Sequence, residues 1–179
     1  MIDPVSLFER AAGGAAETVG RLRPAQLAWT TPCSEWDVRA LVAHMGAGTG
    51  YLLGAIGLDP VAVGGDEVSY RAAVARCVDA LRGDGVLARS CLSPAGFEWS
   101  VADATAGTAM DQLIHTWDLA VAIGADRHLD PELAEACVAM FLPDMPKVGR
   151  AAGFVGPDVA VPADASAQDR LLGAMGRRP

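Results

Sequence analysis

The feature that most constrains the fold of this chain is the spacing of its apolar residues. In every long segment with a regular pattern, they recur at the three- and four-residue intervals of a helix. The first segment covers residues 4–22, the second runs to Ile56, and two more cover residues 66–82 and 103–123. Amphipathic helices bury their apolar stripes against one another, so the sequence predicts an all-α bundle.

Residues that begin and interrupt helices mark the connections. Ser34, with Asp37 three residues further on, is predicted to cap the second helix. Glycine and proline in residues 57–65 indicate a connection to the third helix. The turn residues Pro94-Ala95-Gly96 predict a loop or an irregular hairpin, rather than another helix, over residues 86–101.

The C-terminal third carries shorter elements. Asp130 and Pro131 suit the cap and the first position of a fifth helix, which is expected to end near Leu142. Residues 143–164 are rich in proline and glycine and are predicted to be irregular, before a short closing helix at 166–175. No internal repeat or low-complexity tract interrupts the chain, so we expect a single domain over residues 1–179.

Charge and composition argue against several classes of partner. The chain has 14 basic and 22 acidic side chains, a formal charge of −8, and no basic cluster that offsets the acidic total. This argues against a nucleic acid or an anionic membrane and favours a small-molecule partner. Its basic residues are all arginine except Lys147, a bias that GC-rich codons produce, which favours a high-GC bacterial source.

The expected location is the cytoplasm. The first residues lack a basic segment followed by a long apolar stretch, and no segment approaches the ~20 apolar residues of a membrane span. The cysteines at positions 33, 77, 91 and 137 are spaced too unevenly for a zinc knuckle or a disulfide framework. Reduced thiols are therefore predicted.

Asp111 and His115 are the clearest candidates for a functional site. They stand four residues apart and therefore lie on one face of their expected helix. His44 belongs to another expected helix, where its neighbours one turn away are alanine or glycine and leave room beside the imidazole. Two histidines and one carboxylate from two helices can bind a divalent ion and leave positions open for chemistry.

The surroundings of this pair indicate that it does not face solvent. Apolar residues flank the polar strip of Asp111, His115 and Asp118 on both sides. Burying ionised groups without partners costs on the order of several kcal/mol each, so something must compensate them. A metal ion would do so, and so would an internal hydrogen bond between Asp111 and His115 reinforced by Asp118. The spacing alone leaves both interpretations open.

Three further residues are candidates either for the core or for the edge of this site. Cys33, at the entrance of the second helix, is interpreted as a small packing residue, with a place at the edge of the site as the alternative. Trp36 and Trp117 are interpreted as core residues or as walls of a pocket.

Two motifs resemble those of a known family. One is Thr31-Pro32-Cys33-Ser34-Glu35-Trp36-Asp37 leading to His44, and the other is Asp111 to His115 followed by Thr116-Trp117-Asp118. Together with the last residues of the chain, they are similar to actinobacterial members of the DinB/YfiT-like metalloenzyme superfamily. Within this superfamily, the motifs resemble the group that is related to the N-terminal domain of mycothiol-dependent maleylpyruvate isomerase.

The resemblance implies a four-helix bundle core with additional short helices and an irregular C-terminal segment. It further implies that His44, Asp111 and His115 bind a divalent ion, with Zn²⁺ expected and Fe, Ni or Mn as alternatives. Asp118 is expected to orient a ligand imidazole. The implied activity is a metal-dependent transferase or isomerase that uses mycothiol on a small electrophile, and the relatives also suggest a homodimer.

Two other functions remain open at this point. The same two histidines and one carboxylate can form the facial triad of a non-haem Fe(II) oxygenase. A non-catalytic protein could instead use a pocket of the bundle to hold a small molecule, with the metal structural or absent. The sequence identifies neither the substrate nor a catalytic residue.

Overall fold

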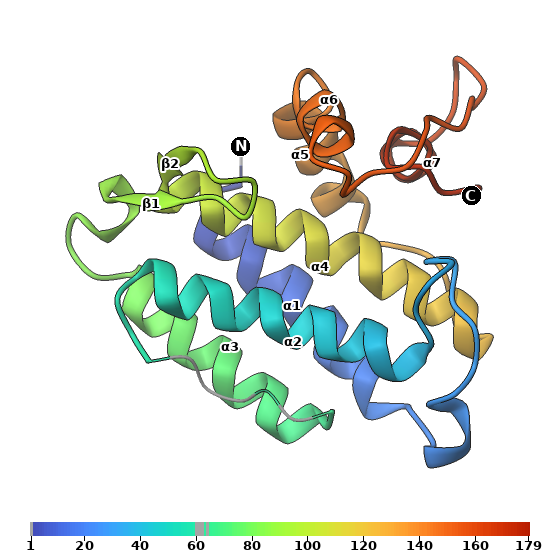
Figure 1. Cartoon of the computed structure of the whole chain (residues 1–179), viewed down its shortest axis with the longest axis horizontal. Coiled ribbons are helices and arrows are strands. Elements are labelled where there is room, and N and C mark those ends of the chain that lie inside the picture. Colours follow the sequence, from blue (N-terminus) through green and yellow to red (C-terminus); the bar gives the residue numbers. More distant parts are fainter. Residues whose placement is uncertain (1, 60–62, 64) are drawn as a thin grey trace. The chain divides into compact units, whose positions relative to one another are not determined.

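The chain forms two compact units in a computed structural model that describes residues 2–59, 63 and 65–179 (Figure 1). The first unit runs to Arg127 and the second from His128 to Pro179. The single domain expected over residues 1–179 stays a prediction. The connection expected at 57–65 includes residues 60–62 and 64, which lie outside the described residues.

Four long helices build the first unit: α1 (Pro4–Gly20), α2 (Val38–Ala55), α3 (Glu67–Leu81) and α4 (Val101–Ile123). Helices α1 and α2 each pack against both α3 and α4, which makes a four-helix bundle (Figure 1). The all-α prediction is therefore confirmed. No helix in the described part of the chain combines the length and the apolar character needed to cross a membrane.

The apolar stripes of these helices meet in one core. Each helix contributes side chains with almost no exposed surface, and burying one of this size stabilises the fold by roughly 1.5–3 kcal/mol. The largest of them are Leu7 and Phe8 from α1, Leu41, Met45, Leu52 and Leu53 from α2, Tyr70 and Leu81 from α3, and Leu119 from α4.

Side-chain caps fix where the helices begin. Asp3 accepts hydrogen bonds from the first amides of α1, and Ser100 forms a reciprocal capping box with Asp103 at the start of α4. The cap predicted for α2 at Ser34 is wrong. Asp37 caps this helix instead, because its carboxylate accepts from the amide of Ala40 and Val38 is the first helical residue.

A short hairpin joins α3 to α4. The sequence predicted either a loop or an irregular hairpin here, and the structure has the hairpin. One 3-10 turn, η1 (Pro24–Gln26), lies between α1 and α2, and another, η2 (Val86–Ala88), follows α3. Strand β1 (Ser90–Leu92) then pairs antiparallel with β2 (Glu98–Ser100). The hairpin is held to α2 because Trp99 donates its indole N–H to the Tyr51 hydroxyl, which donates to the carbonyl of Leu92.

The second unit contains α5 (Pro131–Phe141), α6 (Met145–Ala151) and α7 (Ala167–Ala174), and α5 packs against α7. The predicted cap at Asp130 is confirmed, and the closing helix predicted at 166–175 corresponds to α7, which Ser166 caps. The irregular structure predicted for residues 143–164 is wrong at Met145–Ala151, which form α6. Its proline falls in the first turn, where a missing amide hydrogen costs no helical hydrogen bond.

Candidate metal centre

Helices α2 and α4 bring the three predicted ligands together inside the first unit. His44 projects from α2, and Asp111 and His115 lie one turn apart on α4, which packs against it. One carboxylate oxygen, Oδ1 of Asp111, lies 3.3 Å from Nε2 of His44 and 3.3 Å from Nε2 of His115. The three side chains form a group whose donor atoms all lie within 4.8 Å of one another.

These distances fit the geometry of a bound ion. Zn²⁺ takes nitrogen and oxygen ligands at about 2.0–2.1 Å, and tetrahedral angles then separate neighbouring ligand atoms by about 3.3 Å. A charge-assisted hydrogen bond between the same groups would be shorter, at about 2.7–2.9 Å. The equal separations from Asp111 Oδ1 therefore match the edges of a coordination polyhedron, and the donor set of two imidazoles and one carboxylate suits a divalent metal.

The cluster is buried on one side and open on the other. The side chains of His44 and Asp111 are 37 % and 34 % exposed, whereas that of His115 is 9 % exposed. An ion or a small ligand can therefore approach past His44 and Asp111.

Asp118 fixes the orientation of the His115 ring. Its carboxylate has no exposed surface, and its Oδ2 lies 2.9 Å from Nδ1 of His115. Because a carboxylate accepts hydrogen bonds, Nδ1 is the nitrogen that carries the proton when the ring is neutral. The lone pair is then on Nε2, the atom that faces Asp111.

Cys33 lies beside the imidazole of His115. A place at the edge of the site was the alternative that the sequence left open for this residue. Its sulfur is 3.3 Å from Oδ2 of Asp118 and 4.0 Å from Nδ1 of His115. Cys33, His115 and Asp118 thus form a second group of donor atoms that lie within 4.8 Å of one another. None of the four cysteines, all of which lie in the described part of the chain, forms a disulfide bond.

The turn before α2 positions Cys33 and Trp36. The hydroxyl of Thr31 accepts from the amide of Cys33 and donates to the carbonyl of Trp36, and Thr30 forms an isolated β-bridge with Asp37. These bonds close the segment into a compact loop that ends at the cap of α2.

Trp36 covers the imidazoles, whereas Trp117 is buried. The ring of Trp36 lies 4.5 Å from that of His44 and 5.8 Å from that of His115, between ring centres. It forms one wall of the cluster. Trp117 is 4 % exposed among the core residues, and its assignment as a pocket wall stays a prediction.

The charges of the cluster support one another. Burial alone would raise the pKa of Asp111, but the neighbouring His115 and His44 imidazoles bring it well below its usual range. Burial alone would lower the pKa of His115, but Asp111, with further hydrogen bonds from Asp118 and Cys33, raises it well above its usual value. Without an ion, the cluster therefore favours a positive charge between its carboxylates, a place that a metal cation suits.

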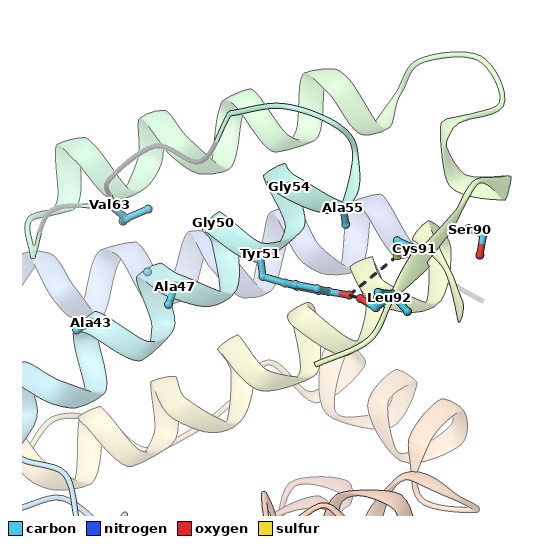
Figure 2. A pocket seen from close by; sticks show the side chains of 11 residues that line it. Ala43, Ala47, Gly50, Tyr51, Gly54, Ala55, Val63, Ser90, Cys91 and Leu92 are labelled. Carbon is cyan, nitrogen blue, oxygen red and sulfur yellow. Dashed lines mark hydrogen bonds between the residues drawn. The ribbon is translucent and has the colours of Figure 1, made fainter. Parts of the chain in front are cut away.

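A groove of about 920 Å³ runs along α2 from Ala43 to Ala55, towards β1. Its floor consists of small residues of α2, and Figure 2 shows Tyr51 reaching across to Cys91 and Leu92. Burial raises the pKa of the Tyr51 hydroxyl to about 12, so it stays neutral. Ala43 and Ala47, which line the groove, flank His44 along the helix, so the groove begins within one turn of that residue.

The first unit is thus a four-helix bundle with a candidate metal centre between two of its helices. The family described as mycothiol maleylpyruvate isomerase N-terminal domain matches residues 8–75, a stretch that includes His44. Uncharacterised proteins from two Mycobacterium tuberculosis strains, CDC 1551 and H37Rv, are each 32 % identical over 136 residues, which cover 74 % of this chain and 74 % of the relative. The chain belongs to the family of mycothiol maleylpyruvate isomerase N-terminal domains. No solved structure matches it.

Proposed function

We propose that this protein binds a divalent metal ion, Zn²⁺ in the first instance, through His44, Asp111 and His115. The observation that carries this proposal is the position of Asp111 Oδ1, 3.3 Å from Nε2 of both histidines. Of the two candidate donor groups, this one is the more accessible to an ion, because Asp118 of the other group has no exposed surface.

We further propose that the centre serves a transferase or isomerase that uses a low-molecular-weight thiol on a small electrophile. The family match supports mycothiol as that thiol, because the description of the family names it. A divalent ion with three protein ligands keeps a position for an incoming thiol and lowers its pKa, so that the thiolate forms near neutral pH.

The residues of the chain would prepare the site for that chemistry. Asp118 holds the proton of His115 on Nδ1 and so keeps Nε2 available as a ligand. Trp36 shields the two imidazoles from water on one side. The exposed edges of His44 and Asp111 leave the other side open to the thiol and the electrophile.

Two alternatives are each favoured by one observation. The donor set itself also suits a non-haem Fe(II) oxygenase. The groove beside α2 has a volume in the range of small-molecule sites, which favours a non-catalytic binding protein.

Metal analysis followed by two activity assays separates these functions. The protein would be purified anaerobically under metal-replete conditions, and its metal content would be compared with that of His44→Ala. We expect about one ion per chain in the wild type and a strong loss in the variant. Thiol consumption with model electrophiles supports the transferase or isomerase, and oxygen consumption supports the oxygenase. No bound metal in the wild type, or equal metal in the variant, would overturn the shared centre.

We place this activity in the cytoplasm, where thiols are kept reduced. A homodimer also stays a proposal, and light scattering of the purified protein tests it. Neither a nucleic acid nor a membrane enters the proposal.

A further inference from the structure

The amide of Gln112 connects three helices of the bundle beside the candidate centre. This side chain is fully buried in α4. Its Nε2 donates to the main-chain carbonyl of Met45 on α2, at 2.8 Å, and its Oε1 accepts from the hydroxyl of Tyr70 on α3. A buried amide without partners would be costly, so both bonds contribute to holding the helices together.

The direction of each hydrogen bond is fixed by chemistry. The carbonyl of Met45 only accepts, so the amide must turn its NH₂ group towards α2 and its oxygen towards α3. Tyr70 must then donate. Burial raises the pKa of Tyr70, so its hydroxyl keeps its proton over the whole range in which the protein is studied. The connection therefore has one arrangement only.

The two ends of this connection lie next to the proposed ligands. Gln112 follows Asp111 on α4, and Met45 follows His44 on α2. Peptide units within a helix are stiff, so the separation of Met45 from Gln112 also sets the separation of their neighbours. The gap of 3.3 Å between His44 Nε2 and Asp111 Oδ1 is one such separation.

We infer that Gln112 is a positioning residue that holds α2 and α4 at the distance at which His44 and Asp111 can share an ion. Tyr70 holds the Gln112 amide in turn. This inference rests on the proposed metal centre and adds a reason for its geometry. Ligand distances in metal sites lie within about 0.2 Å of their standard values, so a directional bond next to the ligands contributes to keeping both of them within reach of one ion.

The test removes the connection and keeps the volume. Gln112→Met retains a long unbranched side chain but loses both hydrogen bonds. We expect its affinity for Zn²⁺, measured by competition with a chelator, to fall about tenfold or more. Bound to Co²⁺, it should also show a changed visible absorption spectrum, because the spectrum reports the geometry of the ligands and not the stability of the fold.

The matched control lies on the same helix. The buried hydroxyl of Thr105 donates to the carbonyl of Val101 within α4, so Thr105→Val removes a buried hydrogen bond that joins no second helix. We expect this variant to bind Zn²⁺ within about twofold of the wild type and to keep its Co²⁺ spectrum. Thermal unfolding of the metal-free proteins shows whether the two variants are comparably destabilised.

The outcomes separate this inference from the metal centre itself. If the wild type binds Zn²⁺ and Gln112→Met binds it equally, with the same Co²⁺ spectrum, the positioning role is wrong and the metal centre stands. If the wild type binds no metal, both fail. Should Gln112→Met not fold, Tyr70→Phe replaces it, because it keeps the bond to Met45. An affinity loss of about threefold or more supports the role, and an unchanged affinity overturns it.

Discussion

Nδ1 of His115 lies 2.9 Å from Oδ2 of Asp118, a carboxylate with no exposed surface. This pairing makes the imidazole a better ligand at Nε2, because a negative acceptor behind the ring raises its basicity. Asp118→Asn keeps the shape of the acceptor and removes its charge. We expect the affinity for Zn²⁺, measured by chelator competition, to fall about 10–100-fold.

The control for this variant makes the same substitution on the surface. Asp79 is an exposed residue of α3, and Asp79→Asn removes one negative charge without touching the cluster. Its affinity should stay within about twofold of the wild type, because exposed charges are screened. Equal affinities of the two variants would show that Asp118 does not support the ligand.

Trp36 should report metal binding by its fluorescence. Its ring lies 4.5 Å from that of His44, so a Co²⁺ ion at the cluster would quench its emission. Titration with Co²⁺ should therefore quench the wild type, and the quenching should be largely lost in Trp36→Phe. Trp29→Phe removes a different, 43 % exposed indole and should retain it. Equal quenching in both variants would place the ion away from Trp36.

Gly107 should resist substitution where Gly13 accepts it. A Cβ at Gly107 would lie 3.1 Å from the ring of Trp99, which its bond to Tyr51 holds in place. We expect Gly107→Ala to lower the free energy of unfolding by about 1–3 kcal/mol, the usual cost of overpacking. A Cβ at Gly13 meets nothing within 4 Å, so Gly13→Ala should raise it by up to about 1 kcal/mol.

Urea unfolding measures both changes. Because both glycines are helical, the intrinsic preference for alanine is the same, and the difference between the variants isolates the contact with Trp99. A gain in stability for Gly107→Ala would mean that the hairpin moves freely over α4.

Local patterns predicted the helices and one half of the site. The bundle follows from apolar residues at helical spacing, and the i, i+4 relation placed Asp111 and His115 on one face of α4. The start of α2 was misassigned because Ser34 and Asp37 are both good caps, and only the bonds of the preceding turn decide between them.

The other half of the site depends on contacts that no local pattern encodes. The sulfur of Cys33 meets Asp118 across 85 positions of sequence, and Gln112 meets Met45 across 67. Gln112 follows Asp111 directly, and its neighbours one turn away along α4 are Thr108 and Thr116, so its surroundings in the sequence do not mark it as a buried contact between helices. Tyr70 has the spacing of an ordinary core residue, so its hydroxyl carried no signal at all.

The buried thiol of Cys77 makes the stability of the first unit depend on pH. Burial raises the pKa of Cys77 from an ordinary value of 9.0 to about 12, and its sulfur contacts the carbonyl of Thr49. Below pH 9 the thiol is protonated in both the folded and the unfolded chain, so its contribution to stability is complete there. Above pH 9 the unfolded chain loses this proton first, and stability falls as the pH rises towards 12.

Cys77→Ala should reduce this dependence on pH. At pH 7 the variant should be less stable than the wild type because it leaves a small cavity, but its free energy of unfolding should fall by about 1 kcal/mol less than that of the wild type between pH 9 and pH 10. Unfolded tyrosines titrate near 10, but both proteins carry the same tyrosines, so their ionisation cancels in the comparison. Urea unfolding at pH 7, 9 and 10 measures the two slopes. Parallel curves for the two proteins would mean that the Cys77 thiol ionises equally in the folded and unfolded chains.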